Sequence, residues 1–201
     1  MSGAGDGGRF TLRAAVVSQI DWWWVALFRP RIDGLTDEEL WWQPAPASWT
    51  FEPGPDGVLK YEWPPGSLGE AEPPVTSIAW RMCHMTCSSL AGWTAALTGG
   101  SRRDGFDVPF PSTASEAVAV LEEWYVRWRD AIDGLSDADL WRSMRGTEFD
   151  VGLDHMRLGS DDPFVNYLLH QQRELIHHGA EISLLRDIYR ATFSNPRQQD
   201  A

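Results

Sequence analysis

Residues 161–193 read DDPFVNYLLHQQRELIHHGAEISLLRDIYRATF. Two aspartates followed by Pro163 are typical of the first turn of a helix, where proline fits and acidic side chains interact favourably with the helix dipole. The apolar residues that follow recur at helical spacing, so that one side of the helix collects Phe164, Leu168, Leu175 and Ile182. The pattern predicts a long amphipathic helix that extends to about Thr192.

Three further segments have the period and length of helices and are bounded by helix breakers. They comprise residues 10–31, residues 76–97 before Gly99 and Gly100, and a segment from residues 112–115 to Ile132. Four long helices predict an all-α fold, a four-helix bundle, in a single domain over residues 9–192. We expect a disordered N-terminus over the glycine-rich residues 1–8 and a flexible tail over residues 193–201.

Between the first two helices, residues 44–74 are rich in proline, glycine and tryptophan. Residues 50–51 and 59–61 flank a turn-forming stretch at 53–57, so the segment is either a long loop or a small hairpin. An insertion of this length suits a lid over a binding site, and a rigid cover over the end of the bundle fits equally well. We therefore expect a loop or lid insertion at residues 44–74.

A short sequence occurs twice: residues 33–41, DGLTDEELW, return as residues 133–141, DGLSDADLW. Each copy follows a predicted helix. We expect the glycine to end that helix, and Thr36 or Ser136 to cap a short new helix whose leucine and tryptophan fold back onto the bundle. Duplication of a helix pair explains the repeat, although the same stop signal could also arise twice.

Charge and composition narrow the classes of function. The formal net charge is −12 and the basic residues are scattered, which argues against nucleic acids and anionic membranes as partners. The apolar runs are too short for a signal peptide or a membrane span. Cys83 and Cys87 lie one helical turn apart, a poor geometry for a disulfide. We expect a soluble, cytoplasmic protein.

Histidines and a glutamate of the last helix suggest a metal site. Glu174 and His178 lie one turn apart and converge on one point at the edge of the apolar side, whereas His170 and His177 point further out. A third ligand must come from another helix, and His84 stands inside one, among apolar residues. Alone, such a histidine is more often a core residue than a ligand. Together with the Glu174–His178 pair it predicts a divalent-metal site.

Longer motifs carry a resemblance to a family. The Trp80-x3-His84 pattern, the closing Glu174-x3-His178 and the following GAEISLLRD at residues 179–187 resemble the DinB-like, or YfiT-like, superfamily over nearly the whole chain. The likeness is strongest to the branch of mycothiol-dependent maleylpyruvate isomerase, whose metal ligands are His, Glu and His. The resemblance implies that His84, Glu174 and His178 bind a divalent metal, zinc in the first place, with nickel, manganese or iron as alternatives.

The same resemblance implies a thiol-dependent S-transferase or isomerase, in which the metal activates a low-molecular-weight thiol of the mycothiol type toward a small-molecule substrate. No isomerase-specific substrate motif is recognisable, so no catalytic or cofactor-binding side chain is assigned. A hydrolase that uses metal-bound water, and a non-catalytic metal-containing bundle for partner binding, remain alternatives. His170 and His177 offer a three-histidine ligand set, and Cys87 is a rival ligand for which a core position is favoured.

Surface residues suggest how the chain associates. Residues 22–24 are three consecutive tryptophans, which cover three faces of a helix, so at least one indole should lie outside the core. That exposure and the family resemblance predict a homodimer. Near the end of the last helix, we expect Arg186 and Asp187 to take part in an exposed or interhelical ion pair.

Overall fold

The structure, a computed structural model, describes residues 11–51, 59 and 75–193. Within these residues the chain is helical, and β-type pairing is limited to isolated bridges. The expected all-α class is thereby confirmed. The predicted disordered N-terminus, the predicted tail from residue 194 onward and most of the 44–74 insertion lie outside the described residues. None of the helices described is long and apolar enough to cross a membrane.

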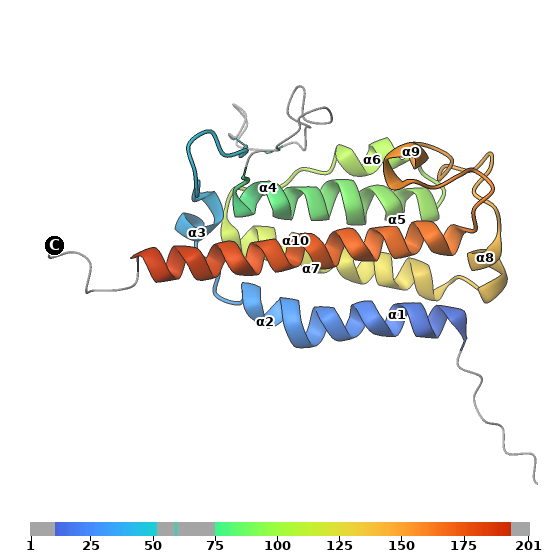
Figure 1. The fold of residues 1–201 in the computed structure, drawn as a ribbon, viewed down its shortest axis with the longest axis horizontal. Coiled ribbons are helices and arrows are strands. Elements are labelled where there is room, and N and C mark those ends of the chain that lie inside the picture. The colour runs from blue at the N-terminus through green and yellow to red at the C-terminus, as the bar shows by residue number, and fades with distance from the viewer. Residues whose placement is uncertain (1–10, 52–58, 60–74, 194–201) are drawn as a thin grey trace, which may run out of the picture.

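Four helical rods lie side by side (Figure 1). The first joins α1 (Leu12–Trp22), η1 (Trp23–Phe28) and α2 (Arg29–Ile32), the second joins α4 (Ile78–Cys83), η3 (His84–Ala91) and α5 (Gly92–Leu97), and the others are α7 (Ala114–Asp133) and α10 (Phe164–Phe193). The short helices are α3 (Asp37–Trp41), α6 (Arg102–Phe106), α8 (Asp137–Trp141) and α9 (Leu153–Met156). The first and fourth rods run in one direction and the other two run in the opposite direction.

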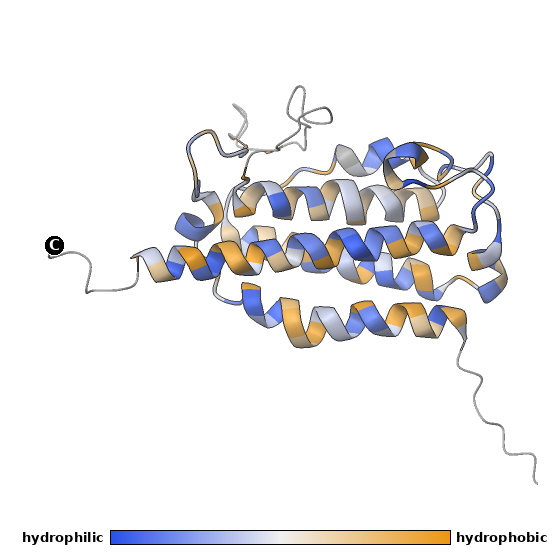
Figure 2. Cartoon of the chain, in the orientation of Figure 1, coloured by the Kyte–Doolittle hydropathy of each residue, from blue (hydrophilic) through white to orange (hydrophobic). Residues whose placement is uncertain are grey.

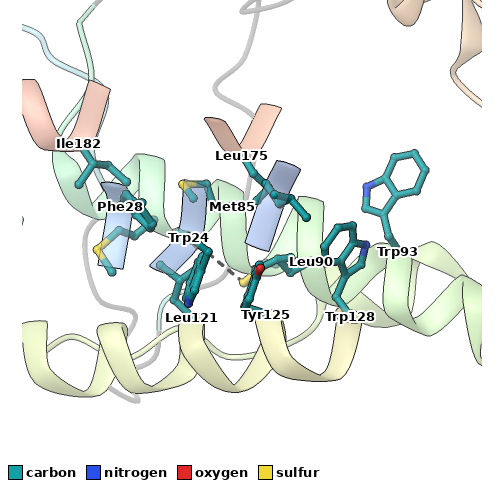
Figure 3. Close-up of a cluster of buried hydrophobic side chains, with 14 of the residues drawn as sticks. Trp24, Phe28, Met85, Leu90, Trp93, Leu121, Tyr125, Trp128, Leu175 and Ile182 are labelled. Atoms are coloured by element: carbon teal, nitrogen blue, oxygen red, sulfur yellow. Dashed lines mark hydrogen bonds between the residues drawn. The ribbon is translucent and has the colours of Figure 1, made fainter. Parts of the chain in front are cut away.

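Apolar side chains from all four rods fill the space between them (Figure 3). Trp24 of the first rod stacks on Tyr125 of α7 with ring centroids 3.8 Å apart. The four apolar residues predicted to face the core from α10 are all buried. In Figure 2 the rods carry hydrophobic and hydrophilic residues in alternating bands, as amphipathic helices do. Since each Å² of buried apolar surface contributes about 25 cal/mol, this core dominates the stability of the fold.

The first and second rods each contain a π-helical segment, which the sequence pattern does not predict. Segment η3 begins at His84, and all of its residues are buried. A π-helical turn departs from the regular i to i−4 hydrogen bonds of an α-helix. Within η3, the carbonyl of Ser89 accepts a hydrogen bond from the side chain of Gln171 of α10 at 2.6 Å. Just beyond, a Cβ placed on Gly105 would lie 2.0 Å from the nitrogen of Gly92. Glycine at position 105 therefore lets α6 approach the second rod closely.

Of the predicted insertion at residues 44–74, the structure describes residues 44–51 and Leu59. Trp49 donates its backbone N–H to the carbonyl of Val75 at 2.9 Å. Leu59 exchanges backbone hydrogen bonds with Phe110, at 3.2 and 2.9 Å. These described parts pair with residues outside the insertion, so they tie it to the starts of the second and third rods.

The repeated segment forms two matching caps. Thr36 with Glu39 at α3, and Ser136 with Asp139 at α8, each form a capping box. The aspartate directly after each capping residue binds a distant helix. Asp37 accepts a hydrogen bond from the N–H of Ala114 at 2.6 Å. Asp137 accepts hydrogen bonds from the N–H groups of Leu12 and Arg13 at 2.9 and 3.1 Å. The first two rods form one half of the chain and the last two rods form the other. Each copy of the repeat therefore caps the first helix of the other half.

The two copies also differ from each other. Gly34 has a left-handed backbone with φ of 65°, whereas Gly134 ends α7 with φ of −71°. Trp41 donates its indole N–H to the carbonyl of Ser112 at 2.9 Å, but Trp141 is 62% exposed. The prediction that both tryptophans fold back is therefore wrong for Trp141, since the buried leucine before it already anchors α8 to the rods.

Arg186 is buried, and its partner is not the adjacent aspartate. Its Nε lies 3.0 and 3.1 Å from the carboxylate oxygens of Glu39, which is equally buried. Its Nη1 donates to the carbonyls of Arg31 and Asp33 at 2.6 and 2.8 Å. Asp187 pairs with the side chain of Arg31 instead. Neighbouring residues of a helix point about 100° apart, so these two side chains find separate interhelical partners.

Candidate metal centre

Three ligand-type side chains from two rods meet at one point. His84 is the first residue of η3, and Glu174 and His178 lie one turn apart on α10. One ligand atom from each lies within 4.8 Å of the others. The imidazole Nε2 of His178 is 3.3 Å from Oε2 of Glu174, and the rings of His84 and His178 are 4.8 Å apart at their centroids. The structure thus brings together the three residues that the sequence analysis selected.

Packing around the site positions both histidines. The ring of Trp80, one turn before His84 on the same rod, stacks on the His84 imidazole at 5.4 Å with an interplanar angle of 7°. Beside His178, a Cβ on Gly179 would lie 2.3 Å from the indole of Trp23. Because Gly179 lacks a side chain, the first rod packs directly against α10 where that helix carries the ligand pair.

Burial and charge favour metal-ready protonation states for two of the three groups. Burial, together with the nearby His178, lowers the pKa of His84 to about 3, so the imidazole is neutral at neutral pH. The hydrogen bond from His178 lowers the pKa of Glu174 to about 2 against the opposing effect of burial. The site therefore offers a free imidazole lone pair beside a carboxylate.

Two carboxylates favour the charged form of the third group, His178. Burial disfavours the charged form of His178, but hydrogen bonds to Glu174 and Glu181 outweigh burial and raise the pKa of its imidazole. In the charged form both ring nitrogens carry a proton, and the N–H of Nε2 points at Glu174. A cation that binds between His84, Glu174 and His178 would take the place of that proton.

Two residues that the sequence analysis did not select lie behind His178. Glu181 places Oε2 2.8 Å from Nδ1 of His178, and Arg81 of α4 places Nε 3.0 Å from the same carboxylate oxygen. The sequence does contain a signal for both residues: Glu181 follows His178 by three positions and Arg81 precedes His84 by three, spacings that share a helix face.

The other histidines of α10 are placed less favourably. Among the residues described, His170 belongs to no potential metal-binding group, and its Nδ1 lies 3.8 Å from Glu174. His177 forms a second group with His178 and Glu181, but its side chain is 65% exposed. The guanidinium of Arg81 on Glu181 places a positive charge at that group, which disfavours a second cation there.

Among the described residues, the two cysteines do not belong to the potential metal-binding groups. Cys83 and Cys87 are buried free thiols with their sulfur atoms 3.9 Å apart. Burial raises the pKa of the Cys83 thiol far above its usual range, which disfavours the thiolate form that a metal requires. In the described part of the chain neither thiol takes part in a potential metal-binding group, and both pack in the core, as favoured from the sequence.

Comparison with known families gives the site a context. The family model of the DinB superfamily matches residues 19–182, which include both segments that carry the candidate ligands. The chain belongs to the DinB superfamily. DinB proteins generally bind a metal, and the His84, Glu174 and His178 group is a possible metal site. Comparisons with curated proteins and with solved structures find no match for the chain.

The donor set of this DinB chain suits a divalent ion. At zinc–ligand distances of about 2.0–2.2 Å, two ligands of a tetrahedral ion lie about 3.3–3.6 Å apart. The separation between Nε2 of His178 and Oε2 of Glu174 is 3.3 Å, and the ligand atom of His84 lies within 4.8 Å of both. Two imidazoles and one carboxylate also leave a coordination position open for a further ligand.

Proposed function

We propose that this DinB chain is a divalent-metal-dependent enzyme whose ion is held by His84, Glu174 and His178. The convergence of these three ligand atoms within 4.8 Å carries the proposal. Zinc is the first choice because it commonly takes nitrogen and oxygen ligands in tetrahedral sites. The four rods would then form a DinB-like four-helix bundle over residues 9–192, with residues 44–74 as a loop or lid insertion between the first two helices.

We further propose that the open coordination position takes a low-molecular-weight thiol of the mycothiol type. A bound divalent ion supplies Lewis acidity that lowers the pKa of such a thiol. The reaction would be an S-transfer or an isomerisation of a small molecule, as the resemblance of the histidine and glutamate motifs suggests. A substrate with an apolar part is supported by the ring of Trp80, which stacks on His84 and itself has the rings of Trp49 and Phe51 at 5.7 and 6.5 Å.

Cobalt substitution tests both parts of the proposal. We expect the protein to bind one Co²⁺ per chain, with the visible absorption typical of a tetrahedral ion. Addition of N-acetylcysteine should produce a sulfur-to-cobalt charge-transfer band, and N-acetylserine, which differs only in its hydroxyl group, should not. Failure to bind cobalt would contradict the metal proposal. Cobalt binding with no new band would contradict the thiol-dependent reaction alone.

The homodimer stays a prediction. The first rod exposes Trp22 and Val25, at 61% and 69%, so the expectation that one indole lies outside the core is confirmed. The rod α10 exposes a row of apolar residues at helical spacing: Leu169, Ile176, Leu184 and Ile188. Unpaired apolar surface of this kind favours association between copies of the chain. Sedimentation equilibrium at micromolar concentration should give the mass of two chains, and the mass of one chain would contradict the prediction.

We also propose a cytoplasmic location. The support is chemical: the two buried cysteines are free thiols, a state that a reducing compartment maintains.

A further inference from the structure

Arg81 is linked to both candidate histidine ligands. It contacts His178 directly and reaches His84 through Trp80. The guanidinium of Arg81 lies 5.3 Å from the ring centroid of Trp80, and Trp80 stacks on His84. On its other side Arg81 pairs with Glu181 at 3.0 Å, and Glu181 contacts His178 at 2.8 Å. One ion pair thus joins the rod that carries His84 to the rod that carries Glu174 and His178.

We propose that Glu181, held by Arg81, is a positioning residue that fixes His178 in the tautomer with a free Nε2. The inference rests on the proposed metal site and concerns how the chain prepares a ligand for the ion. A neutral imidazole carries its proton on one nitrogen only, so the partner of Nδ1 decides whether Nε2 can bind a metal.

The geometry around Nδ1 favours this tautomer. Both Oε2 of Glu181 and Nη1 of Arg81 approach Nδ1 of His178, at 2.8 and 3.1 Å. A carboxylate only accepts hydrogen bonds and a guanidinium only donates them, so the two neighbours select opposite tautomers. The contact with Glu181 is the shorter one and is a hydrogen bond to a charged acceptor, the stronger kind. Glu174 offers a competing acceptor to Nε2, but at the longer distance of 3.3 Å. In the neutral imidazole Nδ1 therefore keeps the proton, and the lone pair of Nε2 is available to an ion between Glu174 and His84.

Arg81 keeps Glu181 in place for this task. The side chain of Arg81 is 19% exposed and that of Glu181 is 32% exposed, so the pair is partly shielded from water. A free glutamate three residues after His178 would sample several rotamers, and the ion pair with another rod restricts them. The second oxygen of Glu181 lies 3.1 Å from Nε2 of His177, whose side chain is mostly exposed and does not belong to the group of His84, Glu174 and His178.

Zinc affinity of the full chain tests the inference, measured by competition with a chromophoric chelator after removal of bound metal. We expect Glu181→Ala to weaken zinc binding by about 10–100-fold, the range typical of residues that support a ligand. Glu181→Gln should weaken it less, because its amide oxygen still accepts the hydrogen bond from Nδ1. His177→Ala removes the other neighbour of Glu181 and should leave the affinity unchanged.

A second measurement separates positioning from a general effect on folding. Two-bond ¹H–¹⁵N spectra of the zinc-free protein, recorded above the pKa of His178, report which ring nitrogen carries the proton. We expect Nδ1 protonation in the wild type and in His177→Ala, and a shift toward Nε2 protonation in Glu181→Ala. An unchanged tautomer in Glu181→Ala would overturn the inference, whatever the affinity, and so would an unchanged zinc affinity. A wild-type protein that binds no zinc would contradict the proposed function, while the tautomer would still test the role of Glu181.

Discussion

Alanine at His84, Glu174 or His178 is expected to lower zinc affinity by more than about 100-fold, beyond the range seen when only a supporting residue is changed. The reason is that a three-ligand site that loses one donor keeps too few bonds to hold the ion. Elemental analysis and chelator competition on each purified variant measure the effect. The melting temperature should fall only modestly, since burial of the aromatic core dominates folding.

His170→Ala and His177→Ala are the matched controls for this prediction. Each removes an imidazole from the same helix, but neither residue belongs to the buried group of three. We expect both variants to keep their zinc. Full metal content without Glu174, together with its loss in either control, would show that another face of α10 binds the ion.

Glu39→Ala is expected to lower the free energy of unfolding by about 3–5 kcal/mol, the loss typical when one partner of a buried ion pair is removed. Glu39 contacts the buried Arg186, and it also lies 2.6 Å from Nε of Arg190. Its removal leaves the guanidinium of Arg186 buried with only carbonyl partners. Urea denaturation followed by circular dichroism measures the change.

Asp139→Ala provides the control for Glu39→Ala. Asp139 holds the equivalent position of the second repeat and makes the same capping-box contacts with Ser136. It has no buried arginine to neutralise, because the arginine that acts on it, Arg142, is exposed. We expect a clearly smaller loss of stability than in Glu39→Ala. Equal losses in the two variants would mean that Glu39 acts only as a cap and that its ion pair with Arg186 contributes nothing.

Local periodicity was sufficient to predict the rods and the ligand-bearing face of α10. The helical spacing of Phe164, Leu168, Leu175 and Ile182 defines the core direction, and the positions of Glu174 and His178 follow from it at about 100° per residue. The same reasoning explains why His177 is exposed. His84 alone would have been assigned to the core. Its place in a second helix, beside the need of the Glu174–His178 pair for a third ligand, selected it, and the family resemblance implied the same three residues.

Features that depend on contacts between distant residues could not be predicted in this way. The pairing of Arg186 with Glu39 and of Arg81 with Glu181 joins helices that are far apart in the sequence, so no local pattern contains it. The π-helical segment at His84 is equally hidden, because its small buried residues show no change of period. Both repeats were predicted to fold their tryptophan back onto the bundle. The indole N–H of Trp41 does so, by donating to the carbonyl of Ser112 in the connection before α7, whereas Trp141 is exposed.

The reciprocal caps affect how the chain folds. The first N–H groups of α1 depend on Asp137, which is more than 120 positions away in the chain, and the first N–H of α7 depends on Asp37. A fragment that contains only one half would begin with a helix whose cap is incomplete. Amide protons at both helix starts therefore gain full protection from exchange with solvent only after the two halves have docked, which makes folding of the halves cooperative.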